Sequence, residues 1–296
     1  MIMNSIRLLL SCGLFSTIVI DSIQSLSISS RTSMNQWASE EKFCANILQP
    51  CQCFVNAETN LLSVHCKGDE RIVNNNLDQI LIRIAQTVDD IQFDELILEN
   101  FTKILAINFT KIQRVPVKTI RIFNCQHLER FSGDDRFNLT STLAQSLIEI
   151  ELSGNKAIDS DQLFKFLYTQ FPRLQSIILS SINYQQIPVF NRNQNNKCLP
   201  WKRLIFNHRC TSPEQQRQPI IIEQKDQFID LCNVRWLDLS CMNLKHINQM
   251  AIMKLCQNLN VTSTTTNGRQ LHVDLSYNPL LNIDQWTGDD DVHIEF

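Results

Sequence analysis

Residues 147–158, LIEIELSGNKAI, share the spacing of their apolar side chains with residues 234–244, VRWLDLSCMNL, and residues 273–280, VDLSYNPL. In each stretch two apolar residues lie two positions apart, and a further buried-type residue follows three positions later. Alternation with a period of two is typical of a short strand with one buried face. The chain therefore contains at least three copies of one strand-and-turn unit.

Weaker copies of this unit fill the chain between and before these stretches. Seven residues taken as equivalent give steps of 24, 30, 27, 27, 33 and 36 residues; they are Leu96, Ile120, Ile150, Ile177, Leu204, Leu237 and Val273. The pattern L-x-x-L-x-L-x-x-N-x-L at such a period is typical of leucine-rich repeats. We expect an α/β fold, a leucine-rich repeat solenoid of about seven irregular repeats. Helical patterns that Ser160 and Asn248 can cap argue against the alternative, a set of unrelated sandwich strands.

In the turn after each predicted strand, buried backbone N–H and C=O groups need hydrogen-bond partners. Asn155 and Asn278 occupy the position at which an inward amide side chain can do this. Cys125 and Met242 occupy the same position in two other repeats. We therefore expect the array to be locally irregular at these two residues.

The first residues are typical of a secretory signal peptide. One cation, Arg7, precedes an apolar run from Leu8 to Ile20, which is short for the roughly 20 residues that a bilayer requires. We assign residues 1–26 to the signal peptide, with a signal anchor as the alternative, and expect a secreted, extracellular protein without a membrane span in the mature chain. Four N-x-S/T sequons predict N-glycosylation. These are Asn100, Asn108, Asn138 and Asn260.

The composition is that of a globular protein, with 43% hydrophobic and 19% charged residues. No run of Lys or Arg could follow a phosphate backbone, so we expect no nucleic-acid partner. The six histidines are scattered, and the motifs H-E-x-x-H and G-x-S-x-G and a glycine-rich phosphate loop are absent. We therefore expect no enzyme activity, no catalytic residue, no metal site and no cofactor.

The cysteines agree with an oxidising compartment. Of the 11 cysteines, Cys12 lies in the signal peptide, which leaves an even number. Cys198 and Cys232 precede their strands by similar distances, which predicts a disulfide between them, and a disulfide between Cys210 and Cys241 is the parallel prediction. The remaining two, Cys125 and Cys256, are expected to be buried or free.

A cluster of four cysteines lies directly ahead of the array in CANILQPCQCFVNAETNLLSVHC, residues 44–66. The order C-x6-C-x-C-x12-C followed by repeats resembles the cysteine-rich N-terminal flank of extracellular leucine-rich repeat proteins, which caps the first repeat. That resemblance implies two disulfides, Cys44 with Cys53 and Cys51 with Cys66. Zinc bound by these thiols with His65 is the alternative, and an oxidising compartment favours disulfides.

A narrower resemblance covers roughly residues 44–155. The segments PCQCFVNAETNLLSVHCKG, FDELILENF and IRIFNCQHLERF, with a helical segment after the first, resemble secreted arthropod proteins described as like the non-catalytic subunit of crustacean (oplophorus) luciferin monooxygenase. The resemblance implies an accessory or recognition role without an active site. Such proteins carry a cysteine-rich C-terminal cap after the last repeat, whereas this chain has acidic residues there.

These observations divide the chain into four parts. They are a signal peptide at 1–26, an N-terminal cysteine-rich cap and helix at 40–90, a leucine-rich repeat array at 91–285 and an acidic C-terminal tail at 286–296.

The outward residues of the strands are the expected binding surface. Alternation places one column on the concave face of the sheet, and it consists of Ile97, Arg121, Glu151, Ile178, Ile205, Asp238 and Asp274. Within and beside it we expect a partner-binding patch of Ile178, Ile205, Trp236, Phe123 and Arg203, apolar at its centre with a charged rim. A register slip of one residue would turn these residues inward.

The function that we expect is that of a secreted recognition or scaffold protein that binds an extracellular protein through this face. The alternatives are the non-catalytic subunit of a secreted enzyme complex, and a receptor that recognises a carbohydrate or lipid pattern.

Overall fold

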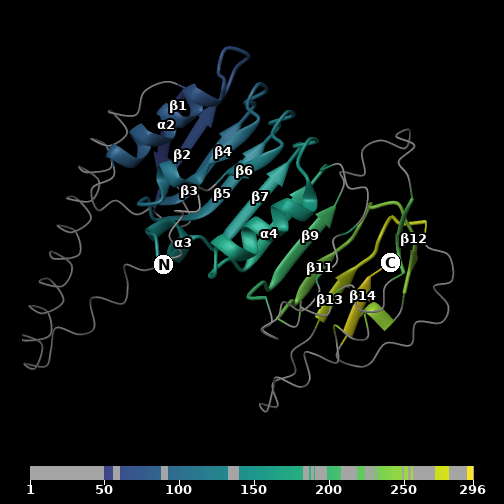
Figure 1. Cartoon of the computed structure of the whole chain (residues 1–296). Helices are drawn as coiled ribbons and strands as arrows, with labels where there is room; N and C mark the ends of the chain where they lie inside the picture. The colour runs from purple at the N-terminus through teal and green to yellow at the C-terminus, as the bar shows by residue number, and fades with distance from the viewer. Residues whose placement is uncertain are drawn as a thin grey trace, which may run out of the picture. The chain divides into compact units, whose positions relative to one another are not determined.

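The computed structural model of the chain describes residues 50–55, 61–87, 93–132, 140–182, 187, 190, 199–207, 219–223, 228, 231, 233–248, 250–252, 255, 271–279 and 292–295. All of them belong to the compact unit Ile47–Phe296. The fold is mixed α/β and is dominated by one large, mainly parallel sheet (Figure 1). The predicted signal peptide at residues 1–26 lies outside the described residues.

Ten strands form the large sheet, and they follow one another in it in their order along the chain. They are β1 Cys51–Val55, β2 Leu62–Lys67, β3 Phe93–Glu99, β5 Val117–Phe123, β7 Glu149–Ser153, β8 Ser176–Ser180, β9 Arg203–Asn207, β11 Trp236–Asp238, β13 Leu271–Asp274 and β14 Val292–Glu295. β1 is antiparallel to β2, and every later pair of neighbours is parallel. Each parallel pair therefore needs a crossover outside the sheet.

The register of the sheet confirms the predicted equivalence of the strands. The seven residues chosen from the sequence pair with one another across neighbouring strands and form one continuous row. They are Leu96, Ile120, Ile150, Ile177, Leu204, Leu237 and Val273. Each of the seven is at most 2% exposed. Burial of this row fixes the register, because a slip of one residue would turn the whole row to the other face.

The crossovers carry the remaining elements. These are α2 Asn74–Thr87, β4 Ala106–Asn108, the 3-10 helix η1 Phe109–Ile112, β6 Arg130–Ser132, α3 Thr142–Ser146, α4 Ser160–Gln170, β10 Ile220–Ile222 and β12 Leu244–Ile247. β4 pairs with β6 and β10 pairs with β12, in two short parallel sheets. Figure 1 shows α2 and α4 on the same side of the large sheet.

Aromatic side chains fill much of the space between the large sheet and these crossovers. Two groups of rings have centroids 5.1–6.0 Å apart within each group; the first is Phe109, Phe131, Phe166 and Phe171, and the second is Phe164, Phe190, Trp201 and Phe206. Tilted and edge-to-face contacts at this range are favourable beyond the area that they bury. The core thus lies on the crossover side of the sheet and leaves the opposite face to other side chains.

The turn asparagines act as the sequence predicts. Asn155 is fully buried; its Oδ1 accepts the N–H of Cys125 at 2.9 Å, and its Nδ2 donates to the carbonyl of Ile122 at 2.9 Å. Asn278 Oδ1 likewise accepts the N–H of Met242 at 3.0 Å. Each asparagine therefore serves the preceding turn, which has no asparagine of its own at that position.

At Met242 the predicted irregularity is present in the turn, where Cys241 and Asn243 both have positive φ and the pairing of β10 with β12 shifts register beside Leu244. The irregularity expected at Cys125 and Met242 does not extend into the large sheet. The pairings β5 with β7 and β11 with β13 contain no register shift. The physical reason is that the asparagine of the following turn satisfies the backbone groups that these two side chains leave open.

The helix starts agree with prediction in one case and differ by one residue in the other. Asn248 Oδ1 accepts the N–H of Met250 at 3.0 Å, and residues 250–252 are helical, as predicted. The cap of α4 is Asp159, whose Oδ1 accepts the N–H of Gln162 at 3.0 Å, and not Ser160. Ser160 is already the first helical residue, so its side chain is not in the capping position.

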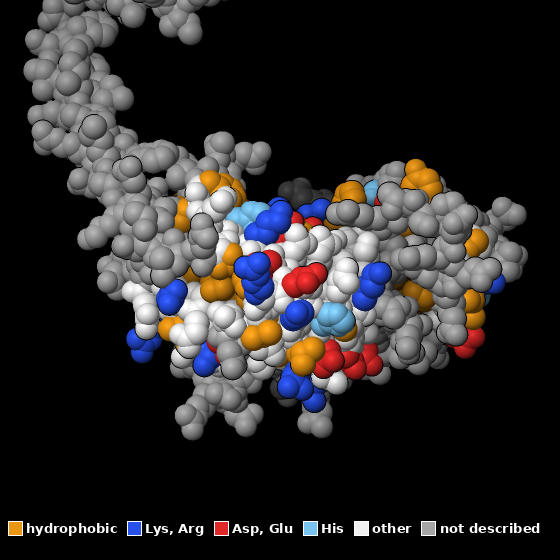
Figure 2. Space-filling view, turned by 90° about the horizontal axis from the view of Figure 1, so that it is seen from above, with side chains coloured by type: hydrophobic (Ala, Val, Ile, Leu, Met, Phe, Trp, Pro, Cys, Tyr) orange, Lys and Arg blue, Asp and Glu red, His pale blue; other side chains and the backbone are white. Residues whose placement is uncertain are grey.

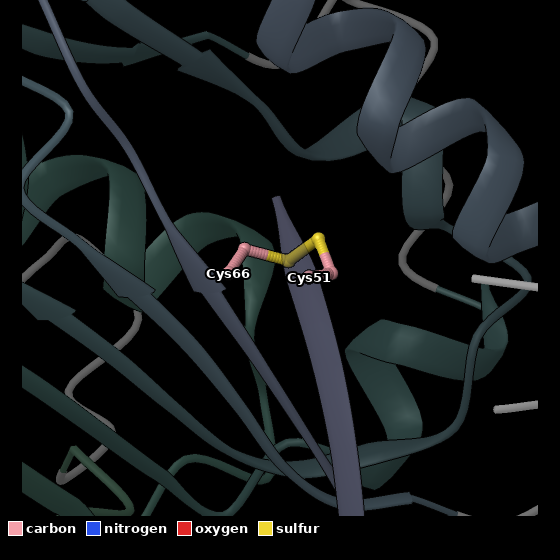
Figure 3. The surroundings of a disulfide bond; sticks show 2 residues. All are labelled: Cys51 and Cys66. Carbon is pink, nitrogen blue, oxygen red and sulfur yellow. A yellow bond between two sulfur atoms is a disulfide. The ribbon is translucent and has the colours of Figure 1, made fainter. Parts of the chain in front are cut away.

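The hairpin of β1 and β2 is tied by a disulfide. The Sγ atoms of Cys51 and Cys66 lie 2.05 Å apart (Figure 3). This is one of the two pairs that the resemblance implies, and it removes both thiols from the zinc alternative. Cys53 is also disulfide-bonded, and its predicted partner Cys44 lies outside the described residues.

The last strand lies where the sequence analysis placed an acidic tail, at 286–296. Val292–Glu295 forms β14 and pairs in parallel with β13. The sheet therefore extends beyond residue 285, at which the array was predicted to end. Four residues beside an acidic run carry too little periodicity to be read as a strand.

Candidate functional site: the outward face of the sheet

The side chains that alternate with the buried row form what we call the outward face of the large sheet. Its central row is Ile97, Arg121, Glu151, Ile178, Ile205, Asp238 and Asp274, as predicted. The row two residues earlier is Ser63, Glu95, Thr119, Glu149, Ser176, Arg203, Trp236 and His272. The row two residues later is Lys67, Glu99, Phe123, Ser153, Ser180 and Asn207. Neighbouring strands are about 4.8 Å apart, so side chains in one row can touch.

An ion cluster around Arg121 occupies the middle of this face. Arg121 Nε lies 2.8 Å from Glu95 Oε1 and 3.3 Å from Glu151 Oε2, and its Nη2 lies 4.0 Å from Glu149 Oε1. The N–H of Nε is not aligned for a hydrogen bond, so these short contacts are ion pairs. Arg203 Nη1 lies 3.9 Å from Glu149 Oε2. Three carboxylates thus face one close and one distant guanidinium group.

Burial disfavours the ionised form of two of these carboxylates. The side chains of Glu95 and Glu151 are 11% and 22% exposed. Burial raises the pKa of Glu95, and the opposing effect of Arg121 does not cancel the rise. Burial likewise raises the pKa of Glu151 against the effect of Arg121, and the charge of Glu149 adds to both increases. The guanidinium groups therefore do not fully offset the cost of burying these two carboxylates in their charged form.

A separate group of charges surrounds Glu99 at the β2 side of the face. His65 Nε2 lies 2.8 Å from Glu99 Oε2, and Lys67 Nζ lies 3.9 Å from Glu99 Oε1. Asn100 Nδ2 also donates to Glu99 Oε1 at 3.1 Å. Glu99 is therefore paired with groups from β2 and with Asn100, and it is not one of the carboxylates paired with Arg121.

An aromatic stack lies further along the same face. The rings of Trp236 and His272 are stacked, with centroids 3.9 Å apart and an angle of 21° between their planes. Trp236 is 41% exposed, and it pairs in register with Arg203 on its other side. Trp236 is therefore outward, as predicted, and offers a large apolar surface beside a cation.

The predicted patch is only partly assembled. Ile178 and Ile205 pair in register on β8 and β9, and Trp236 and Arg203 pair on β11 and β9. Phe123 lies on β5, with β7 between it and β8, so it is not part of this group. Ile205 is only 6% exposed, so its predicted place on the open surface was wrong. The central part of the patch therefore consists of Ile178, Trp236 and Arg203.

Two aspartates of the central row have a structural role. Asp238 Oδ1 accepts the N–H of Ser240 at 2.8 Å, and Asp274 Oδ1 accepts the N–H of Ser276 at 2.9 Å. Aspartate bonds of this kind stabilise the turn that follows. The sequence phrases LDLS and VDLS thus encode the turn at the end of the strand, and these two carboxylates are already engaged.

No protein-family model, curated protein or solved structure matches the chain. Within the residues that the structure describes, no helix is both long enough and apolar enough to cross a membrane. In the same part of the chain, no group of three or more His, Cys, Asp or Glu side chains is arranged to hold a metal ion.

The remaining cysteine predictions are only partly within the described residues. Cys241 is disulfide-bonded, but its predicted partner Cys210 lies outside them, as do both members of the predicted pair Cys198 and Cys232. Cys125 is buried and free, as predicted, and burial raises the pKa of its thiol to about 12. Cys256 also lies outside the described residues.

Two of the four sequons can be placed. Asn108 is half-buried at the start of η1, and its Oδ1 accepts hydrogen bonds from Thr110 N at 3.0 Å and from Thr110 Oγ1 at 2.6 Å. Asn100 is half-buried and contacts Glu99. Asn138 and Asn260 lie outside the described residues. Glycosylation at all four stays a prediction.

The sequence analysis missed Glu95 and Glu149 as members of the outward face. Both lie two residues before members of the predicted central column, Ile97 and Glu151. Extending the same alternation by one step would have placed both on this face. Their contact with Arg121 depends on side-chain reach across neighbouring strands, which periodicity does not give.

Proposed function

We propose that this protein is a secreted, N-glycosylated leucine-rich repeat protein that recognises an extracellular protein through the outward face of its large sheet. In this proposal residues 91–285 form an irregular solenoid with that face on its concave side. Residues 40–90 supply the N-terminal cysteine-rich cap and its helix.

The observation that carries the proposal is the single buried row shared by seven strands, at steps of 24 to 36 residues. Stacked repeats present the other side of such strands as one continuous surface, which is the usual binding surface of repeat proteins. On this surface Trp236 is 41% exposed beside Arg203. Trp is among the residue types most enriched where binding energy is concentrated.

The distribution of charge supports a protein partner over a nucleic acid. Figure 2 shows Lys and Arg side chains interspersed with Asp, Glu and His on the face that it presents, and hydrophobic side chains in small separate groups. Nucleic-acid surfaces instead gather basic side chains into a patch or stripe.

A pair of substitutions tests the proposal. We expect Trp236→Ala to weaken binding to a partner, purified by affinity from the native extracellular fluid, by about 2 kcal/mol or more, with little change in Tm. Leu237, the next residue, is fully buried. We expect Leu237→Ala to lower the free energy of unfolding by about 2–5 kcal/mol through lost burial and a cavity. Isothermal titration calorimetry and thermal unfolding measure the two effects.

The contrary outcomes are distinct. Equal losses of Tm in the two variants would show that Trp236 belongs to the core, and unchanged affinity in Trp236→Ala would exclude this face as the binding surface. Co-purification with a catalytic chain would favour the accessory-subunit alternative. Binding to a purified glycan or lipid without any protein partner would favour the pattern receptor.

A further inference from the structure

We propose that the outward face accepts a lysine side chain of the partner protein, held between the carboxylates of Glu149 and Glu151 and the hydroxyl of Ser176. This inference rests on the proposed function and specifies the chemistry of the partner. It is carried by the charges of the face, by one unsatisfied buried hydroxyl and by the loose position of Arg203.

The outward face has an excess of carboxylates between β3 and β9. Its three rows hold four glutamates and two arginines over these strands; they are Glu95, Glu99, Glu149, Glu151, Arg121 and Arg203. Glu99 is held by His65 and Lys67 from β2. The other three glutamates therefore share Arg121 and the distant Arg203, and a further cation would be attracted there.

Ser176 supplies the second observation. It is 8% exposed, and its Oγ is buried without a hydrogen-bond partner. In register it lies between Glu149 and Arg203, on the same face. A buried hydroxyl without a partner is destabilising, so this position favours a ligand that can donate to it.

An ammonium group fits this set of acceptors. It has three donors and no acceptor, which matches two carboxylates and one hydroxyl oxygen. A metal ion is a poorer match, because no group of three or more His, Cys, Asp or Glu side chains in the described part of the chain is arranged as metal ligands.

Arg203 borders the same place without filling it. Its side chain is 49% exposed, and its Nη1 is 3.9 Å from Glu149 Oε2, which is beyond hydrogen-bond distance. An exposed ion pair at this distance contributes little stability, so a better donor can displace it. Arg203 therefore competes with the incoming lysine.

The position of Trp236 sets the reach of the bound segment. β7, which carries both glutamates, lies three strand spacings from β11, which carries Trp236. That is about 14 Å, or the length of about four residues of an extended chain. The partner segment should thus carry a lysine and a large apolar side chain about four residues apart.

Calorimetric titration of the full secreted chain with pentalysine tests the inference, with pentaglutamate as the reference peptide. We expect pentalysine to bind and pentaglutamate not to bind. Glu149→Gln and Glu151→Gln should each weaken pentalysine binding by about tenfold, because each removes a partly buried charge partner. Arg203→Gln should strengthen it by about threefold, because it removes the competing cation. Glu129→Gln is the matched control, since it removes one exposed carboxylate next to β6, outside the large sheet.

Three results would overturn the inference. They are equal binding of both peptides, equal losses in Glu129→Gln and Glu149→Gln, and weaker binding in Arg203→Gln. Thermal unfolding of each variant checks that the fold is retained, and the gain expected for Arg203→Gln cannot result from misfolding. If Glu149→Gln keeps full affinity for the natural partner while Trp236→Ala loses it, the inference fails and the proposed function stands.

Discussion

Four strands of the large sheet are followed directly by a residue with positive φ, and β11 and β13 are followed by one three residues later; only one of the six residues is a glycine. They are Asn100, Asn124, Gly154, Ser181, Cys241 and Tyr277, with φ between 54° and 72°. Five of their N–H groups donate to a carbonyl of the next strand in the sheet or of its turn, at 2.8–3.1 Å. Where the residue directly follows its strand, this bond continues the ladder of the sheet by one step. The geometry is therefore imposed by the turn, even on residues that disfavour it.

At Gly154 a side chain would be strained, because the backbone is left-handed there and the side chain of Asn124 lies close by. A Cβ there would lie 2.6 Å from Asn124 Oδ1, and φ is +72°. We expect Gly154→Ala to lower the free energy of unfolding by about 1–3 kcal/mol. Urea unfolding measures this, with Ser181→Ala as the control, because Ser181 already has a Cβ at the equivalent position. Partial recovery in Gly154→Ala with Asn124→Gly would identify the contact as the cause, and equal losses in Gly154→Ala and Ser181→Ala would contradict it.

Single residues also show where sequence reasoning stops. The side of the sheet on which Trp236 lies follows from alternation, and the structure agrees. The burial of Ile205 does not follow, because alternation gives a direction but not what packs over a side chain. The same limit applies to Phe123, since its distance from the patch depends on which strands intervene.

At the scale of elements, the buried asparagine of one turn stabilises the turn before it. We expect Asn155→Ala to lower the free energy of unfolding by about 2–4 kcal/mol, because it leaves the buried N–H of Cys125 and carbonyl of Ile122 without their partner. The urea midpoint measures the loss. Asn76→Ala, at an exposed site on α2, is the control and should change stability by less than about 0.5 kcal/mol. Equal midpoints for the two variants would contradict this role.

The elements differ in how far the sequence predicts them. The long crossover helices α2 and α4 follow from periodicity, because each buries an apolar stripe, such as Leu77 and Leu81 of α2. The short strands β4, β6, β10 and β14 were not predicted. Three or four residues do not complete a periodic pattern, and their pairing depends on neighbours that are distant in sequence.

At the scale of the whole molecule, the cluster on the outward face couples stability to pH. Burial raises the pKa of Glu95 and of Glu151 above the ordinary glutamate value. A raised pKa in the folded state favours folding below the unfolded-state pKa, and this contribution is lost as the pH rises through the folded-state value. These two carboxylates therefore stabilise the fold more at acidic than at neutral pH.

The double variant Glu95→Gln and Glu151→Gln tests this direction. We expect the Tm of the wild type, relative to that of the variant, to fall as the pH is raised from about 5 to about 8. Four charged groups on β2, β3, β5 and β7 act on the pKa of Glu95, and burial outweighs the lowering effect of the two cations. Asp94 and Glu149 raise this pKa, and Arg121 and His65 lower it. Burial also outweighs the cations at Glu151, whose pKa is raised by Glu149 and Glu95 and lowered by Arg121 and Arg203. Glu129→Gln serves as the control. A difference that grows toward alkaline pH would contradict the sign.

The order of the strands in the sheet is their order along the chain, so distant parts of the polypeptide never have to meet. From β3 to β13, each new strand closes a loop of 24 to 36 residues onto its predecessor. Loop closure of this length has a modest entropic cost, and local topology favours fast folding. Folding can therefore begin at any interior pair of strands and spread outward to both ends. A pulling force applied to the two ends would reverse this path and peel off one strand with its crossover at a time.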